Sequence, residues 1–266
     1  MTRRWFLLWL YFVAGSGVIL VIQLARAWTT PPPVHTLSLW QAGFLGLLGV
    51  GGLIALVFRL QHRLVWEIIL TLTLFLGVWY VLIFILPLGW ALVIAALLTL
   101  TEFLWRTVLI HNLFYLLGAI GVAIDFAGWL SPELLVVGLS AFVVYDLVVG
   151  PPGRLMEELA QKLVQTGIVP GFVILERWRQ LGARLNVVIR DPSVTLLGAG
   201  DVILPLSLVA RAALRGILPA LVTLLGLLLG VLVLSRHSSE HPRAALPALA
   251  AGVTLPFLIL LFLGWL

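Results

Sequence analysis

The sequence contains no cysteine and few charged residues. Without cysteine the chain forms neither disulfides nor thiolate metal sites, and thiol catalysis is excluded. Charged residues make up 10% of the 266 residues and apolar residues 62%. In soluble domains about 25% of the residues are charged and about 45–50% are apolar. This composition indicates a polytopic membrane protein. The net charge of +5 therefore suits orientation in a membrane better than binding of nucleic acid, which we do not expect as a partner.

Nine apolar runs are long enough, at roughly 20 residues, to cross the hydrocarbon core of a bilayer. They cover residues 5–25, 38–58, 64–86, 88–105, 107–128, 133–150, 196–214, 216–235 and 245–265. The third and fourth runs are separated only by Pro87, Leu88 and Gly89, and the fourth and fifth only around Arg106. We predict an all-α protein with nine transmembrane helices. It forms a single membrane-embedded domain over 1–266, and its one sizeable hydrophilic loop is cytoplasmic, at 151–195.

The N-terminal segment and the basic residues predict how the chain is oriented. Arg3 and Arg4 precede an apolar stretch that ends at Ala25-Arg26-Ala27, which resembles a secretory signal with its cleavage site. The stretch is longer than a usual signal core, so we expect a retained first span. With the N-terminus in the cytoplasm, only Arg26, Arg211 and Arg215 of the sixteen basic residues lie outside. This asymmetry predicts a cytoplasmic N-terminus and an external C-terminus.

Two aspartates interrupt apolar runs. Asp146 lies in 141–149 and Asp201 in 196–205. A carboxylate near the centre of a membrane helix costs roughly 2.5–3.5 kcal/mol on insertion scales, so each is a candidate functional residue. Asp146 precedes the cytoplasmic end of the sixth run, and Asp201 follows the cytoplasmic start of the seventh. At 1.5 Å per residue both lie roughly 6–8 Å below the cytoplasmic boundary.

The residues around Asp201 favour the entry of water. Gly198 and Gly200 have no side chains, so a partner helix or a substrate backbone can approach closely. Pro205 has no N–H, and the carbonyl of residue 201 therefore lacks its helical donor. Free backbone groups of this kind are tolerated in membranes only inside protein or beside a wet cavity.

Three short motifs resemble the signatures of one enzyme family. Tyr145-Asp146, Gly198-Ala199-Gly200-Asp201 and Pro247-Ala248-Leu249 are similar to the YD, GxGD and PAL motifs of the presenilin and signal peptide peptidase family. These are intramembrane aspartyl proteases. The resemblance implies that Asp146 and Asp201 are catalytic. It implies substrate binding for the other motif residues except Ala199, namely Tyr145, Gly198, Gly200, Pro247, Ala248 and Leu249.

The resemblance also implies how such an enzyme works and where. Two adjacent carboxylates share one proton, so that one activates water and the other donates to the scissile carbonyl. The family requires no metal or other cofactor and cuts the transmembrane helices of single-span proteins. The inside N-terminus resembles presenilins, because signal peptide peptidases have the opposite orientation. The compact size resembles microbial members, which implies a multi-pass cell-membrane protease that needs no accessory subunits. Ala199 stands where presenilins usually have leucine.

Two other interpretations use the same aspartates. A proton-coupled transporter or ion channel also places carboxylates inside a membrane. Type 4 prepilin peptidases carry GxGD as well, but their usual lysine two residues after the aspartate is replaced by Ile203. Many of them also have a cysteine-rich loop, which is excluded here. The three motifs in order favour the presenilin-like protease.

Some features outside the motifs carry lesser predictions. The stretch 185–190 is rich in β-branched residues and is either an edge strand that pairs with an unwound substrate or a loop on the membrane surface. Glu102 with Arg106, and Arg63 with Glu67, are four residues apart, a spacing typical of ion pairs within a helix. His111 is interpreted as a polar helix contact.

Overall fold

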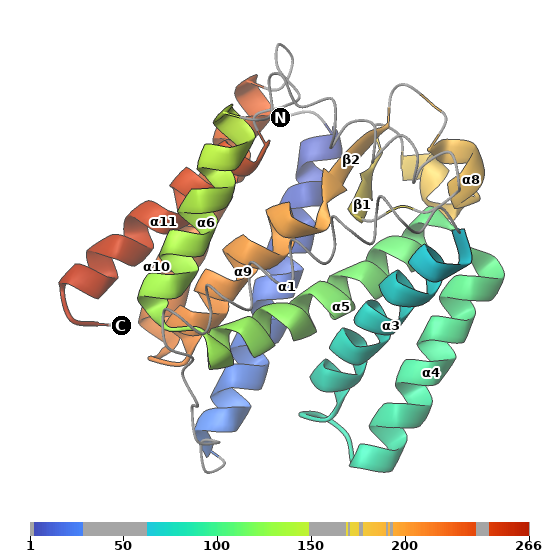
Figure 1. Ribbon diagram of the computed structural model, residues 1–266, viewed down its shortest axis with the longest axis horizontal. Coiled ribbons are helices and arrows are strands. Elements are labelled where there is room, and N and C mark those ends of the chain that lie inside the picture. The colour runs from blue at the N-terminus through green and yellow to red at the C-terminus, as the bar shows by residue number, and fades with distance from the viewer. Residues whose placement is uncertain are drawn as a thin grey trace.

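The part of the chain that the structure describes forms a bundle of helices with one small sheet (Figure 1). The computed structural model describes residues 3–28, 63–148, 169, 171–175, 178–189, 191, 194–237 and 245–265. The α-helices are α1 (Arg3–Trp28), α3 (Arg63–Leu82), α4 (Leu88–Trp105), α5 (Val108–Trp129), α6 (Pro132–Val148), α8 (Leu185–Val188), α9 (Ala199–Ala213), α10 (Ile217–His237) and α11 (Ala245–Phe262). The remaining elements are strands β1 (Gly171–Ile174) and β2 (Thr195–Gly198) and the 3-10 helix η1 (Trp178–Gly182).

Each predicted apolar run that falls on the described residues corresponds to a helix. The run 38–58 lies outside the described residues. Both weak separations are real breaks: Pro87 is the N-cap of α4 with φ −55° and ψ 145°, and Arg106 leaves the helical region with φ 29°. Within the described part, the helices long and apolar enough to cross a membrane are α4, α5 and residues Ile217–Leu234 of α10. The predicted helical fold class is therefore confirmed, whereas the nine spans and the orientation of the termini stay predictions.

Helix α9 is the centre of the bundle. Every residue from 205 to 213 is buried, and α9 contacts α1, α5, α6, α10 and α11. Figure 1 shows α3 and α4 on one side of α5, and α6, α10 and α11 on the other side of α9. With 15 residues, α9 is roughly 22 Å long, which is less than the roughly 30 Å of a hydrocarbon core. The first turn of α9 follows β2 directly and is only partly buried.

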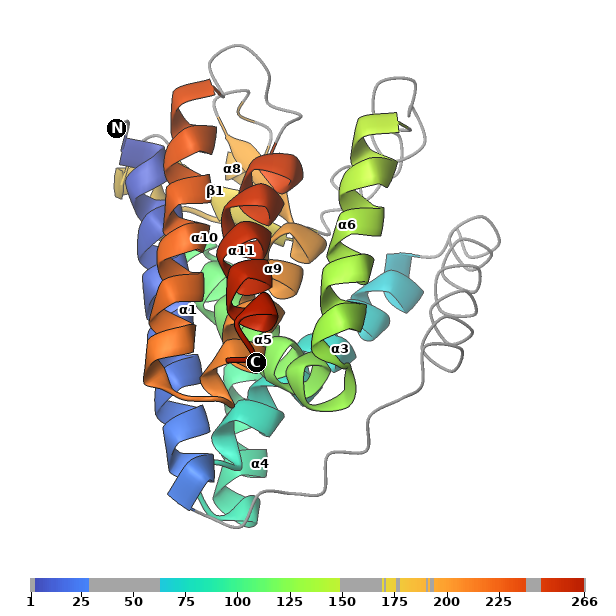
Figure 2. The same ribbon diagram turned by 90° about the vertical axis from the view of Figure 1, so that its left-hand side faces the viewer.

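The sheet consists of two antiparallel strands at one end of the bundle. Gly171 pairs with Gly198, Phe172 with Leu197, Val173 with Leu196, and Ile174 with Thr195. Phe172 and Ile174 belong to the main core, whereas Val173 packs with Val108 and Leu185 in a separate small cluster. Because both of its faces are buried, β1 is a continuous apolar run without alternation. Figure 2 shows the N-terminus at the same end as the sheet and the C-terminus toward the other end.

Strand β2 replaces the predicted start of the seventh apolar run. Residues 196–198 were expected in a membrane helix, but the helix begins at Ala199. Gly198 is its N-cap, with φ −61° and ψ 154°, so the backbone is still extended there. The side chain of Leu197 is buried in the main core, while Leu196 and Gly198 are exposed. This alternation has the period of a strand.

Residues 185–188 do not form a strand, so the edge-strand interpretation of 185–190 is wrong; residue 190 lies outside the described residues. Leu185 to Val188 form one turn of helix, α8. Leu185 and Val188, three residues apart, are buried in the small cluster, whereas Val187 is 69% exposed. Burial of this i, i+3 pair decides the conformation, because a strand would place the two side chains on opposite faces. Tertiary packing overrides the preference of β-branched residues for strands.

Candidate functional site

Asp201 lies in the first turn of α9, three residues after the N-cap Gly198. Its carboxylate folds back toward that cap, since a Cβ on Gly198 would lie 3.4 Å from Oδ2. The first turn of a helix has N–H groups without intrahelical acceptors, and a carboxylate there interacts favourably with them. Asp201 is partly buried. The sequence therefore places a partly buried carboxylate in the first turn of the central helix.

The glycines of this motif differ in their surroundings. A Cβ added to Gly200 would meet nothing within 4 Å, and Gly200 is exposed. A Cβ added to Gly198 would meet the carboxylate of Asp201. Pro205 lies inside α9, so the main-chain carbonyl of Asp201 lacks its usual helical donor. The start of α9 thus combines open space at Gly200 with a proline one helical turn after Asp201.

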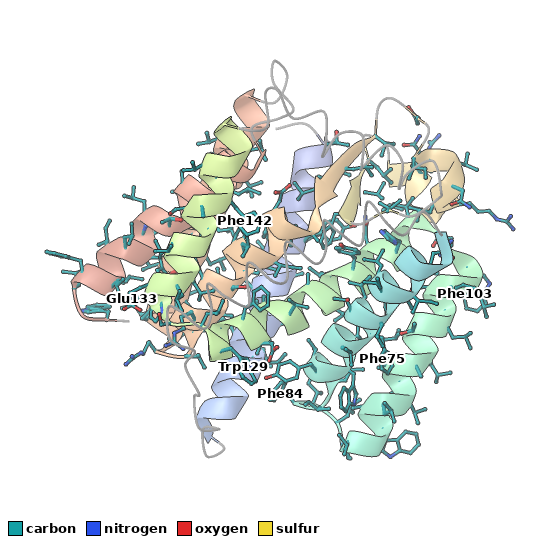
Figure 3. The ribbon with its side chains drawn as sticks, viewed as in Figure 1. Phe75, Phe84, Phe103, Trp129, Glu133 and Phe142 are labelled. Atoms are coloured by element: carbon teal, nitrogen blue, oxygen red, sulfur yellow. The ribbon has the colours of Figure 1, made fainter. Side chains whose placement is uncertain are left out.

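The other two motifs lie at the ends of helices that contact α9. Tyr145 and Asp146 are in the last turn of α6, and Pro247, Ala248 and Leu249 are in the first turns of α11. Leu249 is fully buried in the main core. In Figure 3, Glu133 and Phe142 mark the direction of α6, with Phe142 nearer the end where the sheet lies. The catalytic and binding roles of all these residues stay predictions.

The helices that carry the motifs form one contiguous group. Helix α6 contacts α9, α11 contacts α9, and α11 also contacts α6. These helices are far apart in the sequence, so their association is a product of the fold. It brings together the elements that hold the three motifs.

One edge of the sheet is closed by side chains of α5. Asn112 Nδ2 donates to the Val173 carbonyl at 2.8 Å, and the Val173 N–H donates to Asn112 Oδ1 at 2.9 Å. His111 Nε2 lies 3.0 Å from the Gly171 carbonyl oxygen. The main-chain groups of Gly171 and Val173 thus point toward α5, and the outer edge of β1 is occupied.

The opposite edge of the sheet belongs to β2. In an antiparallel ladder, alternate residues direct their main-chain groups to the partner strand. Val173 points toward α5, so its partner Leu196 points away from β1, and Gly198, opposite Gly171, does the same. A Cβ on Gly171 would overlap the Leu197 carbonyl, so only glycine permits this pairing distance. Edges of this kind accept an added strand.

A polar network lies beside the outer edge of β1. His111 Nδ1 lies 3.2 Å from Glu102 Oε1. Arg106 forms an ion pair with Glu67 of α3, at 3.2 Å. All four line a cavity of about 20 Å³, which is room for about one water molecule. The Gly171 carbonyl can only accept a hydrogen bond, so His111 donates to it from Nε2. The contact between His111 Nδ1 and Glu102 Oε1 then needs a second hydrogen, carried by one of these two atoms.

Of the two ion pairs that the sequence predicted within single helices, the pair of Glu102 with Arg106 is replaced by others, and the pair of Arg63 with Glu67 stays a prediction. Arg106 was expected to pair with Glu102, but it reaches across to Glu67, and Glu102 contacts His111. The reason is that Arg106 lies beyond the end of α4 with a positive φ, so the four-residue spacing no longer measures one helical turn. The side chain of Arg63 lies outside the described residues. His111 is a polar contact, as predicted, although its partners are a strand carbonyl and Glu102.

Comparison with known proteins identifies the fold. No family model and no curated protein matches the chain. A solved structure described as a presenilin family intramembrane aspartate protease is similar, with a TM-score of 0.62 and 20% sequence identity. The similarity covers 94% of this chain and 94% of that chain. The presenilin-like fold that the resemblance implied is thus confirmed, and the roles of the motifs stay predictions.

Proposed function

We propose that this protein is an intramembrane aspartyl endopeptidase of the cell membrane that cuts the transmembrane helices of single-span proteins. The observation that carries the proposal is the mutual contact of α6, α9 and α11, the helices that bear Asp146, Asp201 and Pro247 to Leu249. The similarity of the fold to a presenilin family intramembrane aspartate protease supports it. The chain would act as a multi-pass protein in the bilayer, with no metal, cofactor or accessory subunit.

The proposed chemistry uses Asp146 and Asp201 as a pair that holds one proton. Like charges about 5 Å apart repel by roughly 3 kcal/mol at an effective dielectric near 20, which favours the shared proton. The ionised carboxylate takes a proton from water, and the resulting hydroxide attacks the scissile carbonyl. The protonated carboxylic acid donates to the carbonyl oxygen, which gives a tetrahedral gem-diol intermediate. As the C–N bond breaks, the carboxylate that took the proton of water gives it to the peptide nitrogen, and the other carboxylate takes back a proton from a gem-diol hydroxyl, so that the pair again holds one proton. The two groups titrate as one pair, so both assignments of roles stay open.

Substrate would be held in an extended form. A helix hides its scissile carbonyl in hydrogen bonds, so it must unwind before water can attack, and the freed groups need new partners in a membrane. The edge of β2 at Leu196 and Gly198 offers such partners. Gly198 is also the N-cap of α9, so a strand paired with β2 runs toward Asp201. We assign Tyr145, Gly200 and the segment Pro247 to Leu249 to the walls of the substrate cleft.

Cleavage by the purified protein is the direct test. The protein is reconstituted in liposomes with a single-span reporter, and products are identified by mass spectrometry. We expect Asp146→Asn and Asp201→Asn each to abolish cleavage, with no further loss in the double variant, because the two residues act as one unit. Asp125→Asn is the matched control, because Asp125 lies in α5 and accepts a hydrogen bond from Trp129 Nε1 at 3.0 Å. Normal cleavage by either dyad variant would contradict the proposal.

A proton-coupled transporter or ion channel predicts a different result. The same liposomes would then show pH-dependent flux that Asp146→Asn or Asp201→Asn alters, and no peptide product would form. The absence of cleavage together with such a flux would replace the protease by this second function. The fold similarity to a protease favours cleavage.

A further inference from the structure

We infer that Asn112 is a positioning residue of the proposed protease. It occupies the outer edge of β1, so that an incoming strand can pair only with β2, the strand that continues into α9 and Asp201. This inference rests on the proposed function for its kinetic consequences. The structural part of the inference, that the Asn112 side chain closes the edge of β1 at Val173, is argued from hydrogen bonds and is independent of the proposed function.

The Asn112 amide imitates a neighbouring strand. A strand residue presents an N–H and a C=O on the same side. Asn112 Oδ1 accepts from the Val173 N–H, and Asn112 Nδ2 donates to the Val173 carbonyl, as a residue of a neighbouring strand would. The second hydrogen of Nδ2 is donated to the Tyr11 hydroxyl at 2.9 Å. Val173 needs an acceptor for its N–H and a donor for its carbonyl, so only one orientation of the amide satisfies it. Tyr11, from α1, holds that orientation.

The position of Asn112 argues against a role in packing alone. Its side chain is 0% exposed and lies in an apolar helix, α5. Leucine has nearly the same shape and would not require hydrogen bonds in such a site. A buried amide is tolerated only when its polar atoms have partners, and here those partners are the β1 main chain and Tyr11. These hydrogen bonds offset the free-energy cost of burying the amide and hold the edge of β1 in place.

The neighbouring residue reinforces the closure. His111 contacts the Gly171 carbonyl, so consecutive residues of α5 bind the two residues of β1 that face outward. Phe172 fixes the other face of the strand, with its ring centroid 5.4 Å from that of Tyr11 and 5.2 Å from that of Tyr115. The position of β1 is therefore set by α5 and α1, and β1 in turn sets the register of β2.

The register of β2 matters because Gly198 ends the strand and caps α9. A shift of β1 by one residue would turn the outward main-chain groups of Gly171 and Val173 toward β2. Without the Asn112 amide, in the present register, Val173 would instead present an unpaired edge, and a substrate strand could add to β1 on the side away from β2. Asn112 prevents both outcomes and so commits substrate to the edge next to Asp201.

The test compares Asn112→Leu and Asn112→Asp with Thr223→Val in the full-length protein. Thr223 is also fully buried, but its hydroxyl donates only to the Pro219 carbonyl in its own helix, α10. Hydrogen–deuterium exchange of the 171–175 segment is measured first, because it needs no enzymatic activity. We expect Asn112→Leu, which removes the acceptor of the Val173 N–H, to speed exchange at Val173 by roughly tenfold or more. Asn112→Asp keeps an acceptor and loses only the donor to the Val173 carbonyl, so it should speed exchange less, and Thr223→Val should leave it unchanged.

Kinetics and product mapping form the second arm. The Asn112 variants should raise KM more than they lower kcat and spread cleavage over neighbouring peptide bonds, whereas Thr223→Val should keep one product pattern. If Asn112→Leu does not fold, Asn112→Asp is the deciding variant: it keeps the size of the side chain, loses the donor to the Val173 carbonyl, and is judged by its KM and its cut positions. Unchanged exchange at Val173, or unchanged KM and cut positions in an active enzyme, would overturn the inference. An inactive wild-type protein would instead refute the proposed function, and the exchange arm would still test the edge closure.

Discussion

Leu196 stands opposite Val173 in the sheet, and the two residues direct their main-chain groups to opposite outer edges. Val173 meets Asn112, whereas Leu196 faces the side where we propose that substrate pairs. The two edges of one small sheet therefore have different roles.

Proline at Leu196 should separate folding from cleavage. It removes an N–H from the outer edge and leaves the bonds between β1 and β2 intact, and proline is tolerated at strand edges. We expect Leu196→Pro to reduce kcat/KM at least tenfold with little change in Tm. Leu196→Ala is the control, because it keeps the N–H and removes only the exposed side chain. Equal loss of activity in both variants would remove β2 as the substrate edge.

Alanine at Gly200 tests whether substrate approaches the first turn of α9. The backbone of Gly200 has no positive φ, and an added Cβ meets open space, so alanine fits. Alanine is favoured over glycine in helices by about 0.5–1 kcal/mol, and Tm should rise slightly or stay constant. Cleavage should nevertheless fall, because the methyl group occupies the space proposed for the substrate backbone. Full activity of Gly200→Ala would show that substrate lies elsewhere.

The sequence predicted the helices well because membrane helices need long apolar runs, and such runs are easy to recognise. Pro87 and Arg106 were enough to separate α4 from its neighbours. The strands were missed for two physical reasons. β1 is buried on both faces, so it lacks alternation, and a short apolar run of this kind also fits a helix. β2 is apolar and continuous with α9, and only Gly198 marks the boundary.

The side-chain network was harder to predict than the helices. Spacing along the sequence suggested that Glu102 pairs with Arg106, but the turn at Arg106 changes the neighbours of both. Nothing in the sequence links Asn112 to Val173, 61 residues away. The sequence signal that could have been used is that Asn112 is a polar residue within an otherwise apolar helix. Such contacts depend on tertiary packing and not on local pattern.

The crossing of α3 and α5 provides a stability test. A Cβ on Gly121 would overlap the main chain of Gly77, whereas a Cβ on Gly128, in the same helix, would meet nothing within 4 Å. We expect Gly121→Ala to destabilise the protein by about 1–3 kcal/mol through overpacking, and Gly128→Ala to be neutral or slightly stabilising. Thermal unfolding in detergent measures both. Equal Tm values for the two variants would contradict the close helix crossing.

The orientation in the membrane is tested by labelling single cysteines in a chain that naturally has none. Asn186 in α8 and Trp265 near the C-terminus are both exposed, and the basic residues predict that they lie on opposite sides of the bilayer. An impermeant thiol reagent should label Asn186→Cys only from the cytoplasm and Trp265→Cys only from outside. If both were labelled from the same side, the number of membrane spans between Asn186 and Trp265 would be even. Exchanged sides would mean an inverted protein, the orientation found in signal peptide peptidases, and the proposed site would then open away from the cytoplasm.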